Sequence, residues 1–212
     1  MIKFKLSVDI RQLEVGSESM KRLFIAIPLL ERTRREIVQG IFADESVRRM
    51  PVRWTALQNL HLTVQFLGDI EEKQIPALKQ VLNTVSLSEK PEKLQFTGLG
   101  AFPDQKSPRI IWLGIEKNEY LLKIQREITK TLAEKGFPAD HKRFRPHLTL
   151  GRVRDNAVIT SDLFSYLQGL SERIRISDSP LDKVILYESQ LRPGGPIYTS
   201  VYEKSLIPQN PL

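Results

Sequence analysis

The chain has 212 residues, of which 41% are hydrophobic and 27% are charged, and it contains no cysteine. This composition is typical of a folded globular protein, and it excludes disulfides, thiolate catalysis and cysteine-based metal sites. The formal net charge of +7 favours a polyanionic partner such as nucleic acid.

The longest uninterrupted apolar run covers only residues 23–30, which is far too short to cross a membrane. The first twenty residues carry charged side chains where a secretory signal needs an unbroken apolar segment. We therefore expect a cytoplasmic protein without a membrane anchor. Residues 1–19 precede the first strand pattern and are expected to form an N-terminal extension, followed by a single domain over residues 20–212.

Hydrophobic periodicity and turn residues divide the chain into strand and helix patterns. In chain order, the expected strands are residues 20–29, 61–68, 93–102, 108–116, 143–154, 173–177, 183–191 and 197–206. The expected helices are residues 31–48, 71–85, 119–134 and 162–168, with residues 52–55 and a short loop leading into the second strand. This order predicts an α+β fold with mostly antiparallel sheets flanked by helices.

The second expected strand contains an ionisable side chain in the segment "NLHLTVQFLG". Because side chains alternate along a strand, His61, Thr63 and Gln65 are expected on one face, with Phe66 and its apolar neighbours on the other. A single histidine on a half-buried strand is more often a hydrogen-bonded structural residue than a catalytic one. The argument for a catalytic histidine depends on a second copy of the motif.

The segment "PHLTLGR" repeats this pattern with His147 and Thr149 on one face. Two His-Leu-Thr strands, each following a helical segment, suggest two similar halves that each supply one histidine. If the two strands lie side by side about a pseudo-two-fold axis, their polar faces line one groove with two imidazoles and two hydroxyls. Such a groove suits a phosphate group held between an acid and a base.

Opening a phosphodiester with water needs a base for the water proton and an acid for the departing oxygen. Histidine performs either role near neutral pH. Threonine hydroxyls can donate hydrogen bonds to the non-bridging phosphate oxygens, on which negative charge must be held. The pattern therefore predicts acid–base catalysis at His61 and His147, with phosphate contacts from Thr63 and Thr149.

Two arginines immediately precede the second motif. Arg143 and Arg145 have the same parity as His147, so an extended chain would aim all three at the groove, where arginine can clamp a phosphate. A solvated basic strand end is the alternative for each arginine. Arg152 and Arg154 have the opposite parity and are not assigned to the groove.

The motifs "HLTV" and "HLTL" resemble the paired His-x-Thr-x motifs of the 2H phosphoesterase superfamily, and within it the RNA 2′,3′-cyclic phosphodiesterases, also called 2′-5′ RNA ligases. The similarity extends from "MKRLFIAIP" to "RPGGPIYTSVYEKSL", over about residues 20–206. The resemblance implies a bilobal fold of two pseudo-symmetric lobes around a central cleft, with no metal or other cofactor. It also implies a partner RNA or nucleotide that ends in a 2′,3′-cyclic phosphate, which is hydrolysed to the 2′-phosphate.

Carried over by motif, His61 would protonate the leaving 3′-oxygen and His147 would activate water, while Thr63 and Thr149 hold phosphate oxygens. The reverse step, in which an RNA 5′-hydroxyl replaces water, would make a 2′-5′ linkage. A monomer is expected.

Two other functions compete with this interpretation. A metallohydrolase would need three or four ligands, yet neither motif has a carboxylate at ligand spacing, and His141 is interpreted as a surface residue. A non-catalytic RNA-binding or nucleotide-sensing module could use the same cleft. The chain has no Gly-Lys pair and hence no P-loop. Trp54, Trp112, Phe66 and Phe144 could stack on a base, but such residues are more often core residues, and none is assigned to the site.

Overall fold

The computed structural model describes residues 19–85, 92–137 and 143–207. Nearly all of the expected N-terminal extension, residues 1–19, therefore lies outside the described residues, as does His141. Within the described residues, no helix is long and apolar enough to span a membrane.

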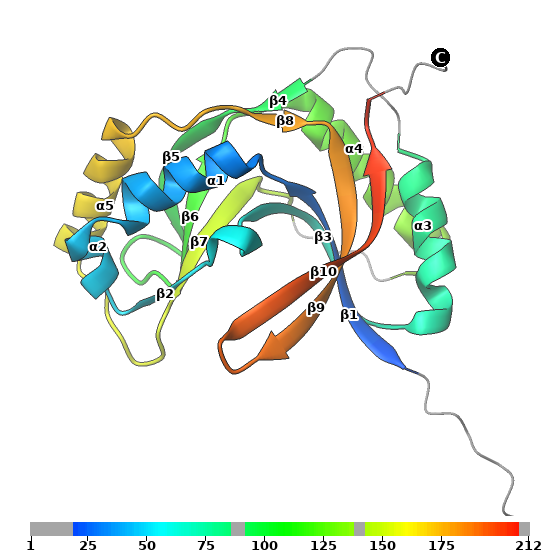
Figure 1. The fold of residues 1–212 in the computed structure, drawn as a ribbon, viewed down its shortest axis with the longest axis horizontal. Helices are drawn as coiled ribbons and strands as arrows, with labels where there is room; N and C mark the ends of the chain where they lie inside the picture. The colour runs from blue at the N-terminus through cyan, green and yellow to red at the C-terminus, as the bar shows by residue number, and fades with distance from the viewer. Residues whose placement is uncertain (1–18, 86–91, 138–142, 208–212) are drawn as a thin grey trace, which may run out of the picture.

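The structure contains both strands and helices, and each of the two kinds also occurs in consecutive runs along the chain (Figure 1). The strands are β1 (Met20–Pro28), β2 (Val52–Trp54), β3 (His61–Glu71), β4 (Glu92–Leu94), β5 (Phe96–Phe102), β6 (Ile110–Ile115), β7 (His147–Val153), β8 (Ser179–Leu181), β9 (Lys183–Arg192) and β10 (Gly195–Ser205). The α-helices are α1 (Glu31–Ile37), α2 (Glu45–Arg49), α3 (Ile75–Asn83), α4 (Glu119–Glu134) and α5 (Ser161–Arg173). Every strand pairing described is antiparallel, which confirms the predicted α+β class.

One sheet runs through the whole molecule in the order β10-β9-β1-β3-β7-β6-β5, and β2 pairs with β7 beside this path. Three strands on each side of the middle correspond, β9-β1-β3 on one side and β7-β6-β5 on the other, while β10 extends the first side by one strand. The two halves join where Leu62 of β3 pairs with Leu148 of β7. The two motifs therefore meet at the centre of a continuous sheet.

The helices follow the same symmetry. Figure 1 shows α1, α2 and α5 at one end of the molecule with β5, β6 and β7, and α3 and α4 at the other end with β1, β3, β9 and β10. Helix α1 follows β1 but lies at the far end, and α4 follows β6 but packs against α3 and β3. Each half therefore contributes a helix to the other half.

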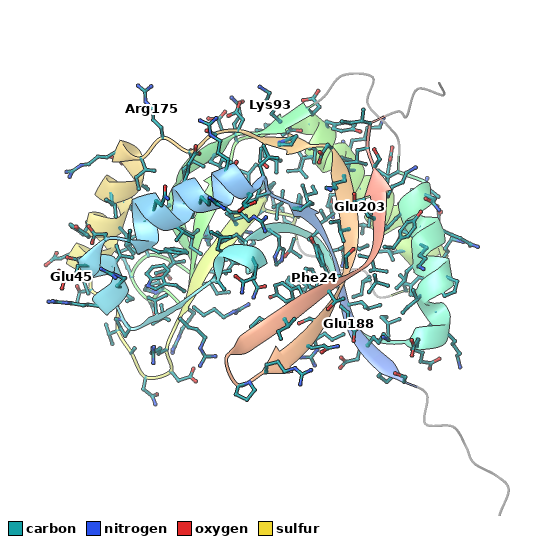
Figure 2. All side chains as sticks on the ribbon, viewed as in Figure 1. Phe24, Glu45, Lys93, Arg175, Glu188 and Glu203 are labelled. Atoms are coloured by element: carbon teal, nitrogen blue, oxygen red, sulfur yellow. The ribbon has the colours of Figure 1, made fainter. Side chains whose placement is uncertain are left out.

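The hydrophobic core covers one face of the sheet beneath these helices. Helix α4 shows how it forms, since Leu121, Ile124, Ile128 and Leu132 recur at helical spacing and are all buried. Charged side chains such as Glu45 and Arg175 project from the periphery, whereas Phe24 lies in the interior (Figure 2).

The predicted strand over residues 173–177 is wrong. Helix α5 is longer than expected and ends at Arg173, and the chain after it is irregular until β8. Side chains of α1 bind the backbone here in place of a strand partner: Glu36 accepts a hydrogen bond from the N–H of Ser177 at 2.7 Å, and Thr33 donates to its carbonyl at 3.2 Å. These contacts connect distant parts of the sequence, so periodicity could not indicate them.

Two other predicted elements are divided. The helix expected over residues 31–48 continues from α1 into a π-helical turn, Val38–Phe42, and restarts at α2, whose first turn is capped by Asp44. The strand expected over residues 93–102 becomes two strands. Strand β4 pairs with β8 in a separate small sheet, while β5 pairs with β6 in the main one.

Several predicted ends also differ from the structure. The first motif strand continues beyond Gly68 to Glu71, the next helix begins only at Ile75, and the second motif strand begins at His147. Residues 143–146 are irregular.

Candidate active site

Strands β3 and β7 each contain a β-bulge at the third residue after their histidine. The register of β3 against β1 steps over Val64, and the register of β7 against β6 steps over Leu150. A bulge inserts one residue that has no partner, bends the strand and re-aims the side chains that follow. The two bulges occupy equivalent positions in the two halves.

The bulges invert the alternation of side chains beyond each threonine. Gln65 is only 3% exposed and accepts a hydrogen bond from Thr129 of α4, whereas Phe66 is 62% exposed. The prediction that Gln65 shares a face with His61, with Phe66 on the opposite face, is therefore wrong. In β7 the same inversion brings the exposed Arg152 to the groove, although its parity had left it unassigned.

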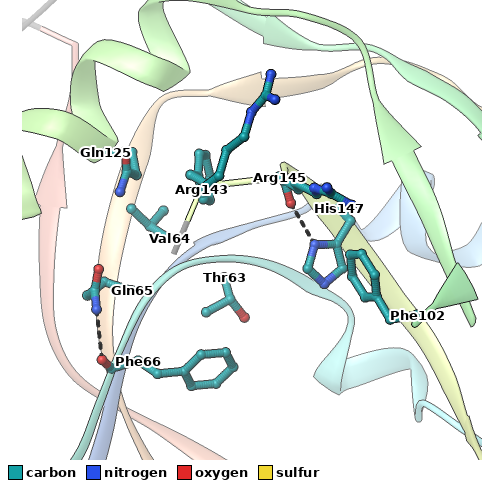
Figure 3. A pocket seen from close by; sticks show the side chains of 10 residues that line it. Thr63, Val64, Gln65, Phe66, Phe102, Gln125, Arg143, Arg145 and His147 are labelled. Carbon is teal, nitrogen blue, oxygen red and sulfur yellow. Dashed lines mark hydrogen bonds between the residues drawn. The ribbon is translucent and has the colours of Figure 1, made fainter. Parts of the chain in front are cut away.

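Two adjoining pockets flank the junction of β3 and β7. One, of about 400 Å³, is called the His147 pocket; it is lined by Thr63, Val64, Gln65, Phe66, Phe102, Gln125, Arg143, Phe144, Arg145 and His147 (Figure 3). The other, of about 300 Å³, is called the His61 pocket; its walls include His61, Thr63, Phe66, Thr149, Arg152 and Tyr198. Thr63 and Phe66 line both pockets, which together form the groove.

Two hydrogen bonds fix the ring of His61. Its Nδ1 lies 2.7 Å from the carbonyl oxygen of Asn59, and since a carbonyl only accepts, Nδ1 carries the hydrogen. In the neutral ring Nε2 then accepts from the hydroxyl of Thr63 at 3.0 Å. The side chain of Asn59 donates to the carbonyl of Pro196 at 2.8 Å, which ties the β9–β10 hairpin to the same loop.

Aromatic rings enclose His61. The centroid of its ring lies 4.9 Å from that of Phe24, 5.2 Å from that of Tyr198 and 6.3 Å from that of Tyr187. These rings exclude water from most of the imidazole. They come from β1, β9 and β10, so the hairpin forms one wall of the His61 pocket.

The surroundings of His147 are more open. Its Nδ1 donates to the carbonyl of Arg145 at 2.7 Å, so Nε2 again lacks a hydrogen in the neutral ring (Figure 3). The rings of Phe102 and Trp112 lie 5.0 and 6.1 Å away, centroid to centroid. No hydrogen bond to Nε2 of His147 is made from the described parts of the chain, and this atom faces the groove available for proton transfer.

Burial sets the protonation of both histidines. The pKa of His61 is lowered from 6.5 to about 4, chiefly by burial and also by the nearby His147, although the hydrogen bond to Asn59 opposes this. Burial also lowers the pKa of His147, against the opposing effect of the Arg145 carbonyl. Both rings are therefore mainly neutral near pH 7 in the protein by itself.

Each threonine lies near the histidine of the opposite half. Thr63 lines the His147 pocket, and Thr149 lines the His61 pocket, as expected for antiparallel neighbours of the Leu62–Leu148 pair. The hydroxyl of Thr55 donates to the Thr149 carbonyl at 3.0 Å and holds that part of β7. The structure thus brings all four predicted motif residues to one groove.

The arginines divide between the two pockets. Arg143 and Arg145 line the His147 pocket, although they lie on an irregular segment instead of the predicted strand. Arg152 lines the His61 pocket, and its charge opposes the rise in the pKa of Tyr198 that burial causes. One feature of the sequence could have indicated that Arg152 faces the groove. Gly151 immediately precedes it, and a glycine within a strand often marks a β-bulge.

The four aromatic residues left unassigned by the sequence lie close to the groove. Phe66 lines both pockets, Trp54 the His61 pocket and Phe144 the His147 pocket. Trp112 lies beside His147, and its Nε1 is buried without a hydrogen-bond partner in the described part of the chain.

Among the described residues, carboxylates do not line either histidine pocket. Across the described ranges, no three His, Asp or Glu side chains are grouped as they would be around a metal ion. The groups that converge on the groove are imidazoles, hydroxyls, guanidinium groups and aromatic rings. This set can bind an anion and move protons.

Comparisons with known sequences identify the same family throughout. Residues 46–190 match the model of the 2′-5′ RNA ligase superfamily. The chain is 34% identical to an RNA 2′,3′-cyclic phosphodiesterase of Aquifex aeolicus over 79% of this chain and 88% of that protein. It is 33% identical to one of Methanocaldococcus jannaschii over 86% of this chain and 99% of that protein.

Comparisons with solved structures agree on the fold. The TT0787 protein of Thermus thermophilus superposes with a TM-score of 0.68 at 26% identity, over 87% of this chain and 97% of that one. LigT of E. coli, solved in complex with NADP⁺, superposes with a TM-score of 0.69 at 24% identity, over 89% of this chain and 98% of that one.

Proposed function

This chain belongs to the 2′-5′ RNA ligase superfamily, and from that premise we propose that it is an RNA 2′,3′-cyclic phosphodiesterase that opens terminal cyclic phosphates to 2′-phosphates. Two imidazoles that the Leu62–Leu148 pairing brings to one groove carry this proposal. Each ring is held at Nδ1 by a backbone carbonyl, so both Nε2 atoms are the ones that can exchange a proton with substrate.

In the proposed step, Nε2 of His147 takes a proton from water, whose oxygen attacks phosphorus. The bond from phosphorus to the 3′-oxygen breaks, and His61 protonates that oxygen. The attacking and leaving oxygens then lie on opposite sides of phosphorus, and each faces one histidine. The phosphate remains on the 2′-oxygen.

The acid role requires a protonated His61, whose pKa is about 4 in the protein by itself. An anionic phosphate in the groove favours the imidazolium ion, because an opposite charge within a few ångströms raises the pKa of a histidine. Protonation of His61 therefore accompanies substrate binding. Nε2 then becomes a donor and can leave Thr63 for the substrate oxygen.

Hydroxyls and guanidinium groups supply the remaining contacts. Thr63 and Thr149 donate to the non-bridging phosphate oxygens. Arg143 and Arg145 approach the phosphate from the His147 pocket, and Arg152 approaches it from the His61 pocket. All three arginines are exposed, and within the described part of the chain no ion pair joins them to a carboxylate, so they are suited to binding an anion.

The test is product analysis with a short RNA that ends in a 2′,3′-cyclic phosphate and with adenosine 2′,3′-cyclic phosphate. The products are separated against authentic 2′- and 3′-phosphates. A predominant 2′-phosphate is expected, whereas a 3′-phosphate would reverse the acid and base roles. Binding of the RNA without turnover would favour the non-catalytic module instead.

We also propose residues 20–212 as a single catalytic domain preceded by the extension 1–19. Its cytoplasmic location and monomeric state stay predictions from the sequence. Size-exclusion chromatography with light scattering, on the full chain and on a chain beginning at Met20, tests the oligomeric state and the role of the extension.

A further inference from the structure

Two arginines lie side by side across the β2–β7 pairing, on the wall of the His61 pocket. Arg53 of β2 is the register partner of Arg152 of β7, and both side chains are exposed and line this pocket. Side chains directly opposite each other on antiparallel strands have Cβ atoms about 4.5–5.5 Å apart, so like charges at these positions repel each other. Such a pair destabilises the sheet unless an anion lies against it.

The backbone holds the arginine pair in this arrangement. The N–H of Thr55 donates to the carbonyl of Leu150 at 2.8 Å, and the N–H of Arg154 donates to the carbonyl of Pro51 at 2.9 Å, one on either side of the pair. Within the described ranges, no hydrogen bond or ion pair involves either guanidinium group of the pair. The two positive charges are therefore fixed in register and available to a ligand.

The other arginine that lines the His61 pocket is neutralised. Arg22 of β1 has Asp69 of β3 as its register partner, and its Nε donates to that carboxylate at 3.2 Å. This is the cross-strand arrangement of opposite charges that stabilises a sheet. The uncompensated positive charge of the pocket is therefore concentrated at Arg53 and Arg152.

The arginine pair lies beyond the reacting phosphate along β7. Thr149, which the proposed function assigns to that phosphate, is the register partner of Trp112 of β6, and Arg152 is the partner of Ile110. Arg152 thus lies two β6 residues further along the strand, which is about 7 Å at strand spacing. Since Arg152 has a role at the reacting phosphate, Arg53 beside it is left for a second anionic group, roughly one nucleotide step away.

The direction of attack places such a group on this side of the groove, and this step rests on the proposed function. The leaving 3′-oxygen faces His61, so the ribose that carries it lies on the His61 side of phosphorus. The 5′-oxygen belongs to the same ribose. In an RNA chain, the phosphodiester to the upstream nucleotide therefore also lies on the His61 side, whereas a free cyclic nucleoside has no such group.

We propose that Arg53, beside Arg152, binds the phosphate on the 5′-oxygen of the nucleoside that carries the cyclic phosphate. In RNA this group is the phosphodiester that joins the terminal nucleotide to the rest of the chain. The subsite makes the enzyme select cyclic ends with a 5′-phosphate over cyclic nucleosides. This specificity comes from β2, which contains neither histidine motif.

The test compares kcat/KM for two substrates that differ by one phosphate group: adenosine 2′,3′-cyclic phosphate and the same nucleotide with an added 5′-phosphate. The dinucleotide adenylyl-(3′→5′)-adenosine 2′,3′-cyclic phosphate supplies the phosphodiester form. Arg53→Gln removes the charge and Arg53→Lys keeps it. Arg175→Gln is the matched control, because this exposed arginine lies at the periphery. The ratio of kcat/KM values within one preparation cancels differences in the amount of folded enzyme.

We expect the unaltered enzyme to prefer the 5′-phosphorylated substrate by about threefold to tenfold, a discounted value for an exposed charge-assisted contact. Arg53→Gln should remove most of this preference, for the monoester and for the dinucleotide. Arg53→Lys should keep part of it, and Arg175→Gln should leave the ratio within about twofold. The salt dependence of kcat/KM for the phosphorylated substrates should also weaken in Arg53→Gln, because one phosphate contact is lost.

An unaltered enzyme that shows no preference for the 5′-phosphate overturns the subsite, and so does a preference that Arg53→Gln retains in full. An equal fall for both mononucleotides in Arg53→Gln overturns it as well and assigns Arg53 to the reacting phosphate. A preference for the dinucleotide alone would attribute the gain to the upstream nucleoside, against the proposal. If the unaltered enzyme opens none of the three cyclic phosphates, the proposed function fails instead.

Discussion

The surroundings of His61 and His147 differ far more than their matching motifs suggest. His61 is enclosed by Phe24, Tyr187 and Tyr198 and is hydrogen-bonded at both ring nitrogens. His147 is held at one nitrogen and faces a more open pocket. A repeated motif places two equal side chains symmetrically about a sheet, but the walls built around it give the two imidazoles different proton affinities.

The largest expected effect is the loss of kcat on removal of a histidine, and it should be similar for the two histidines. His61→Ala and His147→Ala should each lower kcat for cyclic phosphate hydrolysis by about 10² or more, because positioned proton transfer contributes about 10²–10⁴. The double variant should fall far less than the product of the two losses, since the pair acts as one unit. Steady-state kinetics on folded variants checks this. Near-normal turnover in either single variant would break the assignment of two catalytic histidines.

The deeper burial of His61 should appear in the pH dependence of the free energy of unfolding. The pKa of His61 is about 4 in the folded protein and near 6.5 when unfolded, so the unfolded chain binds the extra proton first as pH falls. The free energy of unfolding should therefore decrease between about pH 6.5 and pH 4, by about 3 kcal/mol from this group.

Urea denaturation at about pH 7 and pH 4 measures this loss. His61→Gln should remove more of the pH dependence than His147→Gln does, although burial lowers the pKa of His147 as well. Equal effects of the two substitutions would mean that the enclosed and open sites do not differ in solution.

Substitution of the two threonines should have smaller effects on kcat, and it also distinguishes the surroundings of His61 from those of His147. Thr63→Val and Thr149→Val should each lower kcat by about tenfold, through loss of one donor to the phosphate oxygens. Thr63 also donates to the neutral ring of His61, so its loss should raise the pKa of His61. The pH profile of kcat/KM should therefore shift in Thr63→Val and not in Thr149→Val. Identical pH profiles in the two variants would mean that the hydrogen bond from Thr63 to His61 does not affect catalysis.

Substitution of one arginine in each pocket compares how much the two pockets contribute to substrate affinity. Arg152→Ala, in the His61 pocket, and Arg145→Ala, in the His147 pocket, should each raise KM by roughly threefold to tenfold, a discounted value for exposed charge-assisted contacts. Arg175→Ala is the control, because this arginine lies at the periphery. An effect of Arg152 alone would indicate that the phosphate is held from one half of the groove.

The smallest expected effect is that of a metal chelator. Acid–base catalysis by two histidines needs no Lewis acid, so incubation with a strong chelator should change turnover by less than about twofold. Loss of activity that one divalent ion restores would instead favour the metallohydrolase, and it would make the two histidines ligands.

Local sequence patterns were enough to predict elements whose hydrogen bonds are formed between residues close in sequence, and strands whose side chains alternate regularly between two faces. Helix α4 begins and ends where its pattern predicted, with Asn118 capping its first turn and Gly136 following at a φ of 76°. The motif residues His61, Thr63, His147 and Thr149 could be paired in advance because strand alternation holds over the first three residues of each motif.

Strand alternation failed where the structure departs from a regular strand. Nothing in a count of odd and even positions reveals the extra residues Val64 and Leu150, which decide where Phe66 and Arg152 point. The irregular segment after Arg173 likewise depends on contacts with α1, far away in sequence. Features set by partners elsewhere in the chain were the ones that parity and periodicity could not predict.

Asn59 connects substrate access to proton transfer. Its amide holds Pro196 at the tip of the β9–β10 hairpin, while its carbonyl sets the tautomer and tilt of His61. One residue thereby joins the hairpin wall of the His61 pocket to the ring that must change its charge. The position of the hairpin wall and the orientation of the imidazole are therefore set through the same residue.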